Sequence, residues 1–226
     1  AAEKLYNVRG ALGEDPTEPH HSAPYPFPPV PDEPAIAKVR ARLKANGLHP
    51  YSLPLGVDID RWLAKAKTPW DAHPNCNDGK MDAESTALAE ALKYPNVELR
   101  TNCRVTRLAT APHGRTISTV HYMRGDQAES VSPKLVILSA GAVQSAVLLL
   151  RSASEAFPKG LANNSDQVGR NFMNHNCSAM LAIDPRRRND SVYQKTLMVN
   201  DYYLTGGRDG LPLGNVQLLG KINGDI

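Results

Sequence analysis

Four consecutive aliphatic residues, at positions 135–138, constrain the fold of this chain more than any other feature. A continuous apolar run of that length is typical of a strand buried on both faces, as the strands of parallel sheets are. Ser139, Ala140 and Gly141 follow the run, and the apolar pattern beyond them predicts a helix over residues 143–151. A strand, a tight glycine turn and a helix in this order indicate an α/β fold.

The residues before this run alternate between apolar and polar side chains, which is typical of half-buried strands. Strands are predicted at 97–100, 104–108, 116–122 and 129–131, with turns at 113–114 and 124–126. Together they form an antiparallel meander inserted into the parallel sheet. A helix from Asp82, its expected cap, to Lys93 precedes the meander. Its buried face is predicted at Leu88, Ala89 and Leu92.

Proline punctuates the first part of the chain, so residues 1–31 are expected to be irregular and to lie on another surface or act as a linker. A helix is predicted from Pro34 to the Asn-Gly pair at 46–47, because proline suits a first turn and Asn-Gly suits a helix end. Its apolar face comprises Ile36, Val39 and Leu43. Residues 48–80 are expected to be irregular, with Trp62 and Trp70 as packing anchors. Two further strands are predicted at 177–183 and 215–222.

Composition and charge exclude some functions. The net charge of +3 is small and its basic residues are scattered, which argues against nucleic-acid binding. The most apolar stretch, 135–150, is too short and too interrupted to span a bilayer, so a soluble protein is expected. The three cysteines, Cys76, Cys103 and Cys177, indicate neither a zinc site nor a disulfide framework. They favour a cytoplasmic over a periplasmic location, although the compartment stays open. No metal site is expected, since Cys76, Asp78, Asp82 and His73 lack a ligand spacing.

The turn after residue 138 is a candidate cofactor wall. Gly141 permits close approach to the backbone, and the following helix offers free N–H groups at its positive end. A simple packing turn between strand and helix is the alternative. The Gly-x-Gly-x-x-Gly pattern that would identify a nucleotide site does not occur in these 226 residues.

Residues 141–152 resemble the second signature of the glucose-methanol-choline (GMC) oxidoreductases, with Ala146 and Ala153 replacing the usual proline and glycine. Residues 160–175 resemble the segment after that signature, in the form of the bacterial sugar-dehydrogenase branch. Residues 13–18 and 26–31 resemble the segment before the family's substrate-side helices. The resemblance spans nearly the whole chain but only the middle of the family's length.

The resemblance implies an FAD-dependent enzyme that oxidises an alcohol or sugar hydroxyl. It implies part of a glutathione-reductase-like α/β (α+β) fold, with a parallel sheet, an inserted antiparallel meander and the start of a sheet-based substrate domain. Residues 1–80 would be an extended segment with a substrate-side helix. Residues 81–165 would belong to the FAD-binding domain, and 166–226 would begin the substrate-binding domain.

The resemblance also implies roles for individual residues. Cofactor-binding positions would be Val105, Ser139, Ala140, Gly141 and Ser145, with the Val105 backbone at the adenine. Substrate-side positions would be Gln217 and His175. The alternatives are core packing for Val105, a surface role for Gln217 and a structural role for His175. The family's catalytic histidine region lies outside the resemblance, so no catalytic residue is assigned.

A second reading is a truncated, non-catalytic paralogue or subunit that acts as a binding module. Under the enzyme reading, a partner chain or further residues supply the missing regions, and the electron acceptor is oxygen, a quinone or a protein. The apolar strands need neighbours, so residues 1–226 alone are expected to aggregate through exposed strand edges.

Overall fold

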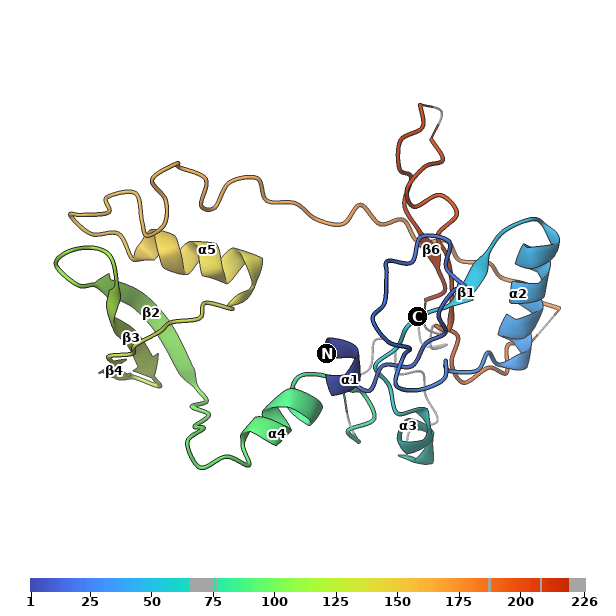
Figure 1. The fold of residues 1–226 in the computed structure, drawn as a ribbon, viewed down its shortest axis with the longest axis horizontal. Coiled ribbons are helices and arrows are strands. Elements are labelled where there is room, and N and C mark those ends of the chain that lie inside the picture. The colour runs from blue at the N-terminus through green and yellow to red at the C-terminus, as the bar shows by residue number, and fades with distance from the viewer. Residues whose placement is uncertain (66–74, 76, 187, 208, 220–226) are drawn as a thin grey trace. The chain divides into compact units, whose positions relative to one another are not determined.

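The computed structural model describes residues 1–65, 75, 77–186, 188–207 and 209–219. The chain divides into two compact units: residues 98–182, here called the meander unit, and residues 1–97 with 183–226, here called the terminal unit. Figure 1 traces the elements of each unit along the chain. The functional boundaries predicted at 80 and 165 remain predictions.

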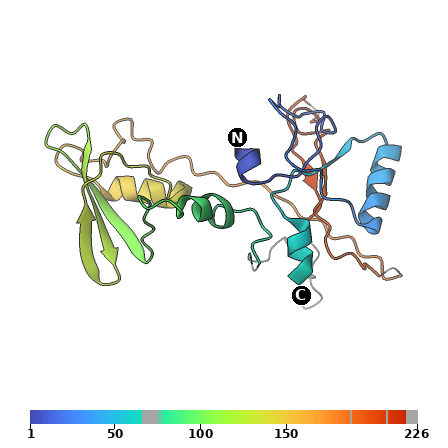
Figure 2. The ribbon, with the colours of Figure 1, turned by 60° about the horizontal axis from the view of Figure 1, so that its bottom comes forward.

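Three antiparallel strands form the sheet of the meander unit, β2 (Cys103–Thr110), β3 (Ile117–Arg124) and β4 (Gln127–Val131). The strand order is β2-β3-β4, which leaves β2 at an edge (Figure 2). The predicted meander is therefore confirmed. Gly125, at a φ of 59°, makes the tight turn between β3 and β4, where a left-handed backbone is needed.

Helix α5 (Gly141–Arg151) packs on the sheet of the meander unit through a small core. Leu148 of α5 and Leu108 of β2 are buried together with Leu161. Val136 and Leu138 are half-buried against this core. The predicted helix after the glycine turn is confirmed, and its buried face explains why it lies on β2.

The strand predicted at 135–138 is not formed, although the structure describes all four residues. Leu135 is 77% exposed and Ile137 is 80% exposed, while the two residues between and after them face the core. The alternation suits a strand, but a strand also needs partners for its backbone N–H and C=O groups. The predictions of strands at 97–100 and 177–183 were also wrong, since both described segments are irregular.

The terminal unit contains a second antiparallel sheet, in the order β1-β5-β6. Its strands are β1 (Pro50–Ser52), β5 (Leu197–Val199) and β6 (Val216–Gln217). Its helices are α1 (Ala2–Leu5), α2 (Pro34–Ala45), α3 (Ile59–Lys65), the π-helix η1 (Glu84–Leu88) and α4 (Ala89–Ala91). The core comprises Val30, Val57, Ile59, Trp62 and Tyr193.

Several predictions for the terminal unit are confirmed. Helix α2 begins at Pro34, and the Leu48 N–H closes its end on the Leu43 carbonyl at 3.1 Å. Gly47 follows the cap with a φ of 78°. Ile36 is buried, as expected, whereas Val39 is 39% exposed. Trp62 is a fully buried anchor, and Trp70 lies outside the described residues.

Other predictions for this unit were wrong. Residues 1–31 include the short helix α1, and 48–80 include β1 and α3. The helix predicted from Asp82 to Lys93 is formed over residues 84–91, as η1 followed directly by α4, but Ala89 and Leu92 of its predicted buried face are exposed. The strand predicted at 215–222 is limited to β6 within the described residues.

Candidate functional site

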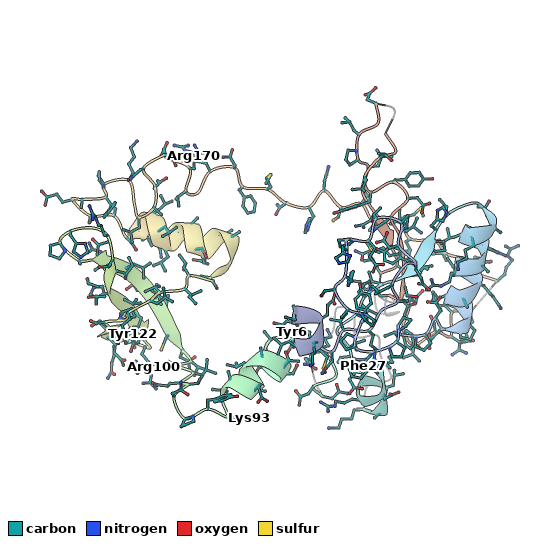
Figure 3. The ribbon with its side chains drawn as sticks, viewed as in Figure 1. Tyr6, Phe27, Lys93, Arg100, Tyr122 and Arg170 are labelled. Atoms are coloured by element: carbon teal, nitrogen blue, oxygen red, sulfur yellow. The ribbon has the colours of Figure 1, made fainter. Side chains whose placement is uncertain are left out.

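The exposed edge of β2 carries the first predicted cofactor residue. Val105 pairs with Tyr122 of β3, beside an irregularity in the register between Val105 and Arg107. Its side chain is 41% exposed among the described residues, and both its cofactor role and the alternative of core packing stay predictions. The Tyr122 hydroxyl accepts a hydrogen bond from Arg100 Nη1 at 2.8 Å and donates to Glu129 Oε2 at 2.6 Å (Figure 3). These bonds fix the position of Tyr122 on β3, the strand that pairs with β2 at Val105.

The glycine turn brings together the other predicted cofactor residues. The Ala140 N–H donates to Ser145 Oγ at 3.2 Å, so Ser145 braces the turn from the first part of α5. Gly141 has a φ of 77°, and the space that a Cβ would fill there is open. Ser139, Ala140 and Gly141 are all exposed. The turn therefore offers accessible backbone and the positive end of a helix to a polar group.

A buried serine joins the β2 edge to α5. Ser152 is 1% exposed, and its Oγ accepts the Leu108 N–H at 2.9 Å while donating to the Leu148 carbonyl at 2.7 Å. The neighbouring Arg107 donates from Nη2 to the Ala153 carbonyl at 3.4 Å. No role was predicted for Ser152, although a serine that ends an apolar helical run was a signal for a buried bond.

The loop after α5 is pinned by backbone and amide contacts. The Leu161 N–H donates to the Leu149 carbonyl at 2.9 Å, directly after Gly160 at a φ of 97°. Asn163 is buried, donates to the Lys159 carbonyl at 2.8 Å and accepts the Val168 N–H at 2.9 Å. This explains why the segment over 160–170 carries so many small and amide side chains.

The two predicted substrate residues lie in different units. His175 is an exposed residue of the meander unit. Gln217 is an exposed residue of β6 in the terminal unit, where its Cα pairs with that of Met198. Neither unit brings the two side chains together, so their substrate roles stay predictions.

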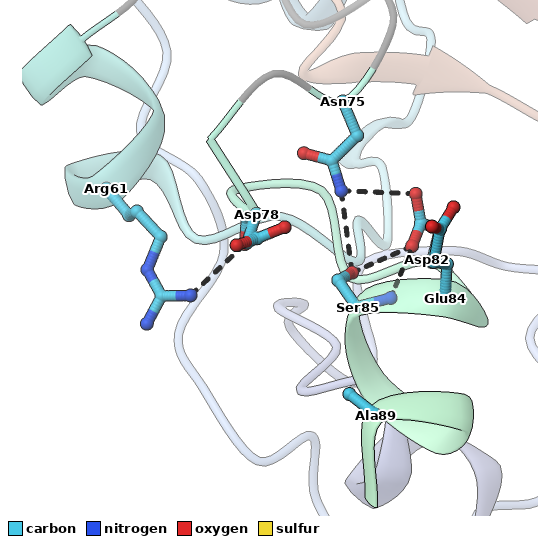
Figure 4. Close-up of a pocket in the computed structure, with 7 residues that line it drawn as sticks. All are labelled: Arg61, Asn75, Asp78, Asp82, Glu84, Ser85 and Ala89. Atoms are coloured by element: carbon cyan, nitrogen blue, oxygen red, sulfur yellow. Dashed lines mark hydrogen bonds between the residues drawn. The ribbon is translucent and has the colours of Figure 1, made fainter. Parts of the chain in front are cut away.

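A separate polar hollow of about 300 Å³ lies in the terminal unit (Figure 4). It is lined by Arg61, Asn75, Asp78, Asp82, Glu84, Ser85 and Ala89. Asp82 accepts hydrogen bonds from the Ser85 N–H at 2.9 Å and from the Ser85 hydroxyl at 2.8 Å, and a further one from Asn75 Nδ2 at 3.1 Å. These bonds, led by the Ser85 backbone, lower the pKa of Asp82. Its carboxylate therefore organises the start of η1, as a helix cap does.

Comparison with known proteins identifies the segment that holds the candidate wall. The model of the GMC oxidoreductase family matches residues 69–177. Among the helices of the described residues, none is long and apolar enough to cross a bilayer.

Three curated relatives illustrate the similarity. The chain is 32% identical over 143 residues to 6'''-hydroxyparomomycin C oxidase of Streptomyces lividus, covering 61% of this chain and 26% of that protein. It is 29% identical over 121 residues to the fructose dehydrogenase large subunit of Gluconobacter japonicus, covering 50% and 22%. It is 28% identical over 120 residues to 2-methyl-1,2-propanediol dehydrogenase of Mycolicibacterium austroafricanum, covering 52% and 22%. The chain thus spans about a quarter of the length of the curated relatives it matches.

Proposed function

We propose, from the match of residues 69–177 to the GMC oxidoreductase family, that the chain forms part of an FAD-dependent enzyme that oxidises an alcohol or sugar hydroxyl. The observation that carries the proposal is which structural elements the matched segment contains. It includes β2, β3, β4 and α5 together with the glycine turn between the last strand and the helix. The candidate cofactor wall therefore lies within the segment that the family model matches.

The residues of the wall suit a flavin dinucleotide. Val105 would meet it with the exposed edge of β2, and Ser139, Ala140 and Gly141 would meet it with accessible backbone. Ser145 would keep the turn in place through its bond to the Ala140 N–H. Bound FAD would supply the redox chemistry, as the acceptor of a hydride from the carbon that bears the hydroxyl, and these residues would supply position and electrostatics.

The finer fold proposal concerns residues 135–138. Their outward side chains, Leu135 and Ile137, are exposed, while Val136 and Leu138 face the core. We propose that this segment becomes a strand of a parallel sheet when further residues of the protein, or a partner chain, supply its neighbours. Burial of both faces would then explain the unbroken apolar run.

The substrate proposal is limited to a class. The names of the relatives describe oxidation of an aminoglycoside, a sugar and a diol, all of which carry hydroxyl groups. Gln217 and His175 would lie on the substrate side. The general base that accepts the hydroxyl proton would come from residues outside this chain.

The test is anaerobic reduction of the flavin in the protein purified at its natural length, called the intact protein here. We expect the visible flavin absorbance to bleach with at least one member of a panel of sugars, amino sugars and small diols. A matched panel of the corresponding O-methylated compounds should leave it unchanged, because the reaction needs a free hydroxyl. A protein that binds flavin but is reduced by none of these compounds would favour the non-catalytic reading.

A further inference from the structure

We propose that Ser152 is a positioning residue for the flavin site, because it fixes the edge strand β2 to helix α5. The proposal rests on the proposed function, since it assigns a task toward bound FAD. It concerns the two parts of the candidate wall, Val105 on β2 and the glycine turn at the start of α5. Ser152 touches neither the cofactor nor the reacting atoms and acts through these two elements.

Ser152 makes hydrogen bonds to both elements. Its hydroxyl is an acceptor and a donor at once, accepting from the Leu108 N–H at 2.9 Å and donating to the Leu148 carbonyl at 2.7 Å. The first bond reaches the middle of β2, and the second reaches the last turns of α5. One side chain thus joins the two elements at a point where it is 1% exposed.

Strand β2 is paired with only one neighbouring strand among the described residues. This strand is at the edge of its sheet, so β3 holds it on one side only. The register between them also shifts between Val105 and Arg107, which weakens the ladder next to the cofactor position. The bond from Leu108 to Ser152 lies between this irregularity and a second one, between Ala109 and Thr110. It therefore restrains a short stretch of β2 that register shifts interrupt on both sides.

Loss of the hydroxyl leaves a buried donor without its acceptor. Removing one partner of such a buried bond costs more than the bond itself contributes, because the remaining group has lost its water as well. We expect the Leu108 backbone to shift toward another acceptor, which moves Val105 relative to the glycine turn. Ser152→Ala should therefore weaken FAD binding about tenfold.

The experiment uses the intact protein, stripped of flavin and titrated with FAD. Ser152→Ala is compared with Ser191→Ala, which removes another buried hydroxyl, bonded to Asn189 Oδ1 at 2.5 Å in the terminal unit. Both variants should melt at lower temperature. Only Ser152→Ala should raise the Kd for FAD and change the visible circular dichroism of the saturated flavin. Ser152→Thr, which keeps the hydroxyl, should restore the wild-type dichroism.

The outcomes separate this inference from the proposed function. Wild-type protein that binds no FAD would overturn the proposed function. Wild-type protein that binds FAD, with a Kd and a dichroism unchanged in Ser152→Ala, would overturn only the positioning role. If Ser152→Ala does not fold, Ser152→Cys replaces it, because a thiol leaves no cavity at this site and is only a weak hydrogen-bond donor and acceptor. A wild-type Kd and dichroism in that variant would equally overturn the role.

Discussion

At Gly160 the backbone has a φ of 97°, and a Cβ built there would lie 2.9 Å from both the Leu149 carbonyl oxygen and Leu150 Cα. We predict that Gly160→Ala lowers the stability of the intact protein by about 3 kcal/mol, through backbone strain and a clash that backbone atoms cannot relieve. Gly125→Ala is the matched control, because Gly125 also has a positive φ but open space around it. It should cost only about 1 kcal/mol. Equal losses in thermal unfolding would contradict the packing argument.

Asp82 gives a pH-dependent prediction at the same scale. Its pKa is lowered in the folded state, chiefly by the hydrogen bond from the Ser85 N–H. The charged carboxylate thus adds stability that is present above the unfolded pKa of about 4 and is lost as the pH falls through the lower, folded pKa. Asp82→Asn keeps a cap but not the charge, so its stability deficit should be constant above about pH 5 and shrink below about pH 4. Urea midpoints across this range measure it, with Asp126→Asn in the exposed turn as control. A deficit that persists unchanged at low pH would refute the assignment.

At the scale of elements, residues 135–138 are the segment whose burial we expect to differ between the intact protein and residues 1–226 alone. Ile137 is 80% exposed here, yet the proposed parallel sheet would bury it. We predict that Ile137→Asn destabilises the intact protein by about 2–4 kcal/mol, because it places a polar amide in a buried strand. Leu213→Asn changes a residue that is 67% exposed in the terminal unit, and should have an effect within about 0.5 kcal/mol. Similar, small effects of both substitutions in thermal unfolding would argue against the buried strand.

Local signals explain which elements could be predicted from the sequence. The meander was predictable because its turns, such as Gly125, lie between strands that are neighbours along the chain. Strands β1 and β5 pair residues about 150 positions apart over only three residues each, so no local pattern reports them. Helix α3 is seven residues long and depends on the burial of Trp62, which is a tertiary effect.

In the candidate site too, contacts between residues close together in the sequence were predictable and contacts between distant residues were not. The glycine turn and Ser145 were predictable because they lie within a few residues of each other and match a family signature. The position of Ser152 at the end of an apolar helical run signalled a buried bond, but its partner was not predictable, because the bond to Leu108 joins positions 44 residues apart. The run at 135–138 was interpreted as a paired strand because an apolar run reports side-chain burial, whereas pairing depends on a neighbouring strand, which the described residues do not place beside it.

At the scale of the whole molecule, the exposed apolar surface leads to a prediction about residues 1–226 alone. Leu135 and Ile137 face water in this chain, and no strand of the described residues pairs the outer edge of β2. Exposed edges and apolar patches drive association, so we expect this chain to aggregate when expressed by itself. Size-exclusion chromatography with light scattering measures the outcome. A monomer that unfolds in one cooperative transition would contradict the idea that the chain needs further residues.

The most direct test of the central claim is the visible absorbance spectrum of the intact protein as purified, with mass spectrometry of the released cofactor. We predict the bands of an oxidised flavin and the mass of FAD, at about one flavin per chain. Absence of bound flavin, together with failure of the protein to take up added FAD, would contradict the claim that these residues form the wall of an FAD site.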